Sequence, residues 1–81
     1  MELKDTVELM NSEDYKERFK AEYIQTKIRY KKLKAMTTKY EAGTLDFEPK
    51  CSLDLLKNQQ FSMGQYLHYL ELRAEIEKIK L

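Results

Sequence analysis

Residues 12–40 constrain the fold most, because their pattern predicts one uninterrupted helix with two apolar faces. One face has the spacing of a core-facing stripe and consists of Phe19, Tyr23, Thr26, Tyr30, Leu33 and Tyr40. The face roughly opposite consists of Ala21, Ile24, Ile28 and Ala35. A helix in a short chain that folds alone needs only one apolar face. The second face therefore predicts a partner, most simply another copy of the same chain in a symmetric assembly.

Basic residues separate these two faces. Residues 12–40 hold nine lysines and arginines against four acids, a local excess of five positive charges, whereas the whole chain has a net charge of +1. Such a helix allows local binding of an anion. The near-neutral total disfavours general binding of nucleic acid. A solvated helix surface is the alternative interpretation of the same lysines.

The size and composition of the chain indicate one small all-α domain over residues 1–81. Two glycines and one proline are too few for an all-β protein. The single Cys51 excludes an internal disulfide, and the single His68 excludes an imidazole pair on zinc. No phosphate loop or nucleophile motif is present, so we expect no catalysis, no metal and no cofactor. Without a membrane-length apolar run or signal peptide, we expect a cytoplasmic protein with no membrane partner.

The expected elements are a short N-terminal helix over residues 1–11, a long helix over 12–41, a loop over 42–51 and a second long helix over 52–80. Leu3, Val7 and Met10 give the first helix its apolar spacing. Ser12 and Ser52 stand where helix caps are expected, and Gly43 is a natural helix end. The two long helices predict an antiparallel hairpin that assembles into a homo-oligomeric helical bundle.

The last helix carries two lines of apolar residues. Its core line is spaced 4, 3, 4, 3 and 4, which is a heptad seam suited to packing along the first long helix, and consists of Leu56, Gln60, Met63, Leu67, Leu70 and Ala74. The second line, which one intrachain helix cannot also cover, consists of Tyr69, Leu72, Ile76 and Ile79. Gly64 lies within this helix at a cost of about 1 kcal/mol against alanine. Two interpretations of Gly64 stay open, a close approach of backbone or ligand and a merely tolerated glycine.

Aromatic and basic side chains occur together along both long helices, which suits a ligand that has bases and phosphates. Arginine presents a flat fork to phosphate oxygens, and tyrosine stacks on a purine. The candidate ligand contacts are Tyr15, Arg18, Tyr23, Arg29, Tyr66 and Arg73. The alternative is that the tyrosines pack in the core or an interface and that the arginines form ion pairs between chains.

Two runs of residues carry a resemblance to a known group of proteins. The run Leu55-Leu56-x2-Gln59-x3-Met63-x2-Tyr66-x3-Leu70-x2-Arg73 resembles the second helix of small phage proteins described as crAssphage-related. The run Glu22-Tyr23-x5-Arg29-x2-Lys32-Leu33 is similar to their first helix. The likeness covers about residues 12–76, although Thr26 stands where such proteins usually have leucine. These proteins in turn resemble the helical-hairpin sponges by which phages inhibit CBASS and Thoeris immunity.

The resemblance implies a phage anti-defence protein that acts without catalysis in the cytoplasm of the infected bacterial host. Sponges of this kind form homo-oligomers and bind cyclic oligonucleotides or cyclic ADP-ribose variants at subunit junctions. The leading hypothesis is therefore sequestration of a cyclic nucleotide immune signal. The first alternative is inhibition of a host or defence protein by direct binding, through the face of Ile24 and Ile28. The second is a DNA- or RNA-binding accessory that uses Lys20, Lys27 and Lys34.

Overall fold

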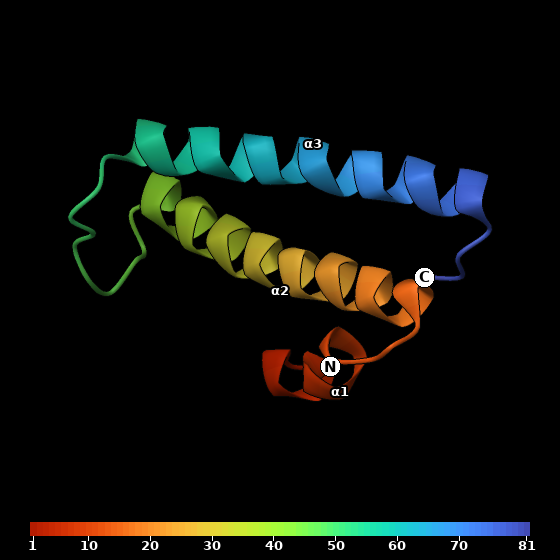
Figure 1. Cartoon of the computed structure of the whole chain (residues 1–81). Coiled ribbons are helices and arrows are strands. Elements are labelled where there is room, and N and C mark those ends of the chain that lie inside the picture. The colour runs from red at the N-terminus through yellow and green to blue at the C-terminus, as the bar shows by residue number, and fades with distance from the viewer.

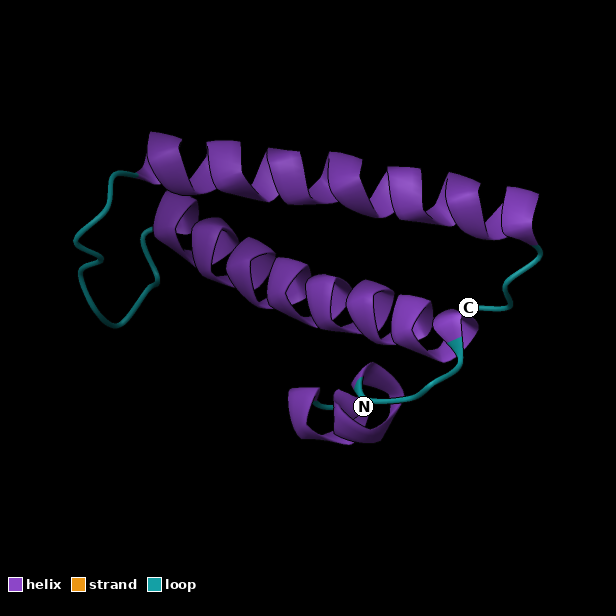
Figure 2. Ribbon diagram, in the orientation of Figure 1, coloured by secondary structure: helices purple, strands orange, loops and turns teal.

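The computed structural model describes residues 1–81 and contains helices and no strand. The elements in chain order are the 3-10 helix η1 (Leu3–Thr6), α1 (Val7–Met10), α2 (Tyr15–Ala42) and α3 (Leu53–Glu77). Helices α2 and α3 run antiparallel, and the molecule measures 43 × 25 × 16 Å (Figures 1 and 2). The all-α prediction, with a short N-terminal helix and a long helix packed on another, is confirmed. None of these helices combines the length and apolarity needed to cross a membrane.

Helix α2 is the middle layer of the fold. Helix α3 packs on one side of it, η1 and α1 pack on the other, and α1 does not contact α3 (Figure 1). The side chain of Thr6 is fully buried and that of Ala21 is 1% exposed. Gln25 Nε2 donates a hydrogen bond of 2.7 Å to Thr6 Oγ1 and so fixes the N-terminal segment on α2.

This arrangement corrects the expectation that the second apolar face of α2 requires another chain. The N-terminal segment of the same chain buries Ala21, while Ile24 and Ile28 are half-buried and only Ala35 is exposed. Apolar burial needs no second molecule where eleven residues of the chain are long enough to fold back over the helix. The N-terminal segment thus replaces a second chain at Ala21, whereas Ile24, Ile28 and Ala35 stay partly or fully exposed.

The core lies between α2 and α3 and follows the predicted heptad seam. Its main cluster consists of Phe19, Tyr23, Leu67, Leu70, Ala74 and Ile79. Leu56 is also buried, and Gln60 and Met63 are partly buried. The 4-3-4-3-4 spacing on α3 is thus confirmed as the line that faces α2. Burial of these side chains supplies the main driving force for closing the hairpin.

Local hydrogen bonds define the ends of α2. Asp14, and not Ser12, is the N-cap, and its carboxylate accepts a 2.9 Å hydrogen bond from the backbone N–H of Lys16. At the other end Gly43 takes the left-handed conformation at φ 75°, which glycine adopts without steric cost. The N–H of Thr44 then bonds the carbonyl of Lys39 at 2.9 Å. Helix α2 therefore begins at Tyr15, three residues later than the start at residue 12 that the sequence predicts.

Helix α3 begins after Ser52, as predicted, and ends at Glu77 instead of residue 80. Ser52 Oγ accepts a 3.2 Å hydrogen bond from the N–H of Leu55. At the far end Lys78 is left-handed at φ 57°, and the Ile79 N–H bonds the Ala74 carbonyl at 2.8 Å. This turn brings Ile79 into the core. The expectation that Ile79 extends the second, outward line of α3 is therefore wrong, because a helix C-terminus of this type turns the next apolar residue inward.

Candidate functional site

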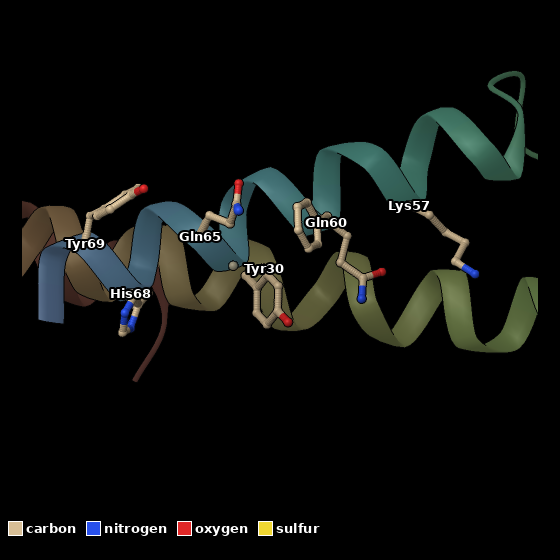
Figure 3. A pocket seen from close by; sticks show the side chains of 8 residues that line it. Tyr30, Lys57, Gln60, Gln65, His68 and Tyr69 are labelled. Atoms are coloured by element: carbon tan, nitrogen blue, oxygen red, sulfur yellow. The ribbon is translucent and has the colours of Figure 1, made fainter. Parts of the chain in front are cut away.

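An open groove of about 570 Å³ follows one edge of the α2–α3 contact. It is lined by Tyr30 from α2 and by Lys57, Gln60, Phe61, Gly64, Gln65, His68 and Tyr69 from α3. The side chains of Lys57, Gln60 and His68 point toward the level of α2, whereas Gln65 and Tyr69 point away from it (Figure 3). The groove therefore has an inner wall between the helices and an outer rim on the free side of α3.

The middle of the groove is the contact between Tyr30 and Gly64. A Cβ added to Gly64 would lie 3.3 Å from Tyr30 Cε1 and 3.6 Å from the Tyr30 hydroxyl. The glycine therefore lets the aromatic ring lie against the backbone of α3. Of the two interpretations of Gly64, the structure supports a close approach. The group that approaches is the Tyr30 side chain and not a backbone or a ligand.

Lys57 and His68 stand at the two ends of the groove. Lys57 forms an ion pair with Glu41, and that hydrogen bond raises the pKa of Lys57. His68 stands at the other end (Figure 3). Lys27 and Lys34 are the i−3 and i+4 neighbours of Tyr30 and so lie beside it on the surface of α2. The groove thus presents an aromatic ring between a lysine and a histidine, with two further lysines beside the ring.

A buried polar contact orients Gln60 at the groove wall. The hydroxyl of Thr37, itself buried, donates a 2.5 Å hydrogen bond to Gln60 Oε1. This bond occupies the amide oxygen and leaves Gln60 Nε2 as the donor of that side chain. The wall can therefore donate a hydrogen bond to a ligand acceptor in a fixed direction.

Tyr23 continues the same edge two turns before Tyr30. Its hydroxyl donates a 2.7 Å hydrogen bond to Glu71 Oε2 and accepts one of 3.3 Å from Lys27 Nζ. The Lys27 ammonium also lies 5.4 Å from the centre of the Tyr23 ring. Burial, followed by the bond to Glu71, raises the pKa of Tyr23. These contacts fix Tyr23 as part of the packed seam.

Among the six predicted ligand contacts, the structure brings Tyr15 and Arg73 together on the opposite edge. Arg73 donates a 2.6 Å hydrogen bond to the Tyr15 hydroxyl and one of 3.2 Å to Glu77. Its guanidinium lies 4.9 Å from the centre of the Phe19 ring. The pKa of Arg73 is raised, first by its hydrogen bond to Glu77. Arg73 therefore joins the end of α3 to the start of α2.

The other predicted contacts are dispersed. Arg18 donates a 2.8 Å hydrogen bond to the Ser12 carbonyl, whereas Arg29 and Tyr66 are exposed. None of the six lines the groove, whose residues include Tyr30 and Gln60, which the sequence pattern assigns to core lines. Gly64 is the one signal that could have located it. No group of three or more His, Cys, Asp or Glu side chains gathers to hold a metal ion.

The fold and the groove define a class of small all-helical proteins in which two long antiparallel helices frame an open aromatic and polar groove. Residues 13–76 match the family model described as Sequestin. Because this match covers most of the chain, the protein belongs to the Sequestin family. No curated protein and no solved structure matches the chain.

Proposed function

We propose that the protein binds a cyclic nucleotide immune signal in the α2–α3 groove and sequesters it without catalysis. Membership of a family named Sequestin supports a sequestering role. Both long helices resemble small crAssphage-related proteins that in turn resemble phage sponges, and this supports the ligand class, a cyclic oligonucleotide or a nucleotide of the cyclic ADP-ribose type. In this proposal the protein is a phage anti-defence factor in the cytoplasm of the infected bacterial host.

The observation that carries the ligand assignment is the aromatic ring of Tyr30 in the groove, with Lys57 at one end and His68 at the other. An aromatic face stacks on a base. Lys57 and His68 lie where they can bind phosphate oxygens, and Gln60 Nε2 can donate to an acceptor on a base edge. The groove also falls within the range of about 300–1,000 Å³ that is usual for small-molecule sites.

Sequestration sets a requirement on affinity that an open groove does not meet alone. Nanomolar binding corresponds to about −12 kcal/mol. Sites for small ligands commonly bury about 70–90% of the ligand surface, whereas this groove is open along its outer rim (Figure 3). We therefore propose that the chain acts as a homo-oligomer in which a second copy helps to enclose the ligand.

The second set of proposed contacts lies outside the groove and consists of Tyr15, Arg18, Tyr23, Arg29, Tyr66 and Arg73. Intrachain hydrogen bonds already engage Tyr23 and Arg73. Arg29 and Tyr66 make no such bond with a side chain or carbonyl and are the members of this set best able to meet a ligand. Their contribution is proposed as secondary to that of the groove.

Isothermal titration of the purified protein with cyclic dinucleotides, cyclic trinucleotides and cyclic ADP-ribose isomers tests the proposal. At least one ligand is expected to bind tightly and to be recovered chemically unchanged. Lys57→Ala and His68→Ala should each weaken that binding about tenfold, a change of about 1.4 kcal/mol. Lys50→Ala, a charge-matched control in the exposed loop, should not.

Three results would contradict the proposal. If no member of the panel binds, a cyclic nucleotide is excluded as the ligand and a protein target is favoured. Conversion of the bound nucleotide into a product removes the non-catalytic role. Equal losses in Arg29→Ala and Tyr66→Ala, with none in Lys57→Ala, would move the site from the groove to the opposite edge.

A further inference from the structure

The free side of α3 repeats the spacing of its core side. The residues that face away from α2 are spaced 4, 3, 4, 3 and 4, shifted by two positions from the core line, and consist of Asn58, Ser62, Gln65, Tyr69, Leu72 and Ile76. We call this line the outer seam. It contains no charged residue, and Tyr69 and Ile76 are 62% and 80% exposed. A heptad seam is the pattern by which one helix packs along another at a shallow angle.

No part of the chain covers the outer seam. Helix α2 contacts α3 on one side and the N-terminal segment on the other, whereas α3 contacts α2 alone among the helices (Figure 1). The two exposed apolar residues beside the seam are Leu55 and Phe61, at 56% and 66% exposure. An apolar strip of this kind on a small protein marks an interaction surface.

We propose that a second copy of the chain occupies the outer seam, with the two α3 helices antiparallel about a two-fold axis at the level of residue 67. The spacing 4-3-4-3-4 reads the same in both directions, so the seam of one chain fits that of an identical chain reversed. In this register Tyr69 lies opposite Gln65 of the second copy. Leu72 lies opposite the small Ser62, and Ile76 lies opposite Asn58.

The side chains beside the seam agree with the same register. Lys57 and Glu75 lie on the same flank of α3, ten residues before and eight residues after residue 67. The antiparallel pair therefore brings Lys57 of each chain about 3 Å, two helical positions, from the level of Glu75 of the other, twice in the dimer. The large apolar side chains of one copy, Leu72 and Ile76, cover the exposed Phe61 and Leu55 of the other. Opposite charges and complementary sizes thus favour a second copy as the occupant.

This dimer completes the groove, a consequence that rests on the proposed function. Gln65 and Tyr69 belong both to the outer seam and to the rim of the groove, and Phe61 lies between them and the inner wall. Because the two-fold axis keeps the same flank of each α3 on the same side, the two grooves face one direction and meet at the axis. The second copy therefore closes the open rim, and the joined site takes one ligand for two chains.

The interface is tested on ligand-free protein by analytical ultracentrifugation. The wild type is expected to have twice the 9.8 kDa mass of one chain. The double variant Leu72→Glu, Ile76→Glu should be monomeric, and Ala35→Glu, an apolar-to-acid control on the exposed surface of α2, should stay dimeric. Circular dichroism should show equal helix content in all three, because glutamate is a good helix former. A monomeric wild type, or a dimeric double variant, would overturn the proposal.

Cysteine pairing tests the register. In a Cys51→Ser background, a chain with Asn58→Cys and a chain with Ile76→Cys should form a disulfide when mixed, and neither should do so alone. Disulfides within each single preparation would show a parallel pair and contradict the antiparallel register. If the protein is dimeric and binds no nucleotide, the proposed function fails and the interface stands. If the monomeric double variant binds as tightly as the wild type, with one ligand for each chain, closure of the groove by the second copy is wrong.

Discussion

The ring of Tyr30 lies 3.3 Å from the position that a Cβ on Gly64 would occupy, so α2 and α3 meet here through an aromatic ring and a bare backbone. Glycine in the middle of a helix costs about 1 kcal/mol against alanine. A larger residue at this position would displace the Tyr30 ring, which forms the centre of the groove. The pair therefore links the packing of the hairpin to the shape of the candidate site.

Gly64→Ala is expected to keep the fold and to weaken ligand binding. Alanine gains about 1 kcal/mol of helix propensity, which offsets the few tenths of an ångström by which the Tyr30 ring must move. The midpoint of thermal unfolding should therefore change little, while calorimetric affinity falls. Gln59→Ala, at an exposed position on the same helix, should change neither quantity. Undiminished binding in Gly64→Ala would show that the Tyr30 contact does not shape the site.

Tyr23→Phe is expected to reduce the loss of stability at alkaline pH. Burial and the hydrogen bond to Glu71 raise the pKa of Tyr23 above its ordinary 10.0 in the folded protein. Its contribution to the free energy of unfolding is therefore complete below about pH 10 and is lost as the pH rises through the folded-state pKa. Phenylalanine does not ionise, so this part of the decrease in the free energy of unfolding with rising pH should disappear.

Urea unfolding on both sides of the tyrosine pKa measures this effect. Near neutral pH the Tyr23→Phe variant should be less stable by about 1 kcal/mol, the value of one lost hydrogen bond. Above the tyrosine pKa the difference from the wild type should narrow. Tyr69→Phe, which alters an exposed tyrosine, provides the control and should follow the wild-type slope. Parallel curves for Tyr23→Phe and the wild type would contradict the assignment.

The two long helices and their common core could be predicted from the sequence, because heptad spacing and capping residues are local signals. The N-terminal segment shows where such signals fail. Leu3, Val7 and Met10 have helical spacing, yet Val7 and Met10 are exposed and Thr6 is the buried residue. The 3-10 turn over Leu3–Thr6 has about three residues per turn, which changes the phase of the side chains. Apolar spacing counted at 3.6 residues per turn therefore selects the wrong face.

The groove could not be predicted because it depends on how α2 and α3 are aligned. Tyr30 has the spacing of a core residue, and Gln60 occupies a heptad position, so the sequence assigns both to packing. Only the alignment of the helices places Tyr30 against Gly64 and Thr37 against Gln60. The pairing of Arg73 with Tyr15 across 58 residues has the same origin. Long-range contacts of this kind produce no periodic pattern in the sequence from which they could be predicted.

Lys78→Gly is expected to stabilise the protein. Lys78 is the one residue other than glycine with a positive φ, 57°, a conformation that costs an L-residue about 1 kcal/mol. Glycine adopts it without that cost, so the free energy of unfolding should rise by about 0.5–1 kcal/mol. Chemical denaturation measures the change, and Lys80→Gly, three residues beyond the helix end, should give no gain. A loss of stability in Lys78→Gly would mean that the Lys78 side chain contributes a contact.

Thr6→Ala is expected to loosen the N-terminal segment from α2. The Thr6 hydroxyl donates a 2.7 Å hydrogen bond to the Leu3 carbonyl and accepts one of 2.7 Å from Gln25 Nε2, and the residue is fully buried. Alanine removes the hydroxyl and leaves the Gln25 amide without its partner, at a cost of about 1–2 kcal/mol. Hydrogen exchange should then accelerate at the amides of η1 and α1 while those in the middle of α3 remain protected. Val7→Ala, which truncates an exposed neighbour, should leave both regions unchanged. If exchange in α3 accelerates as much as that in η1, the segment is part of one cooperative unit with the hairpin, and its docking on Ala21 is a condition for the hairpin to fold.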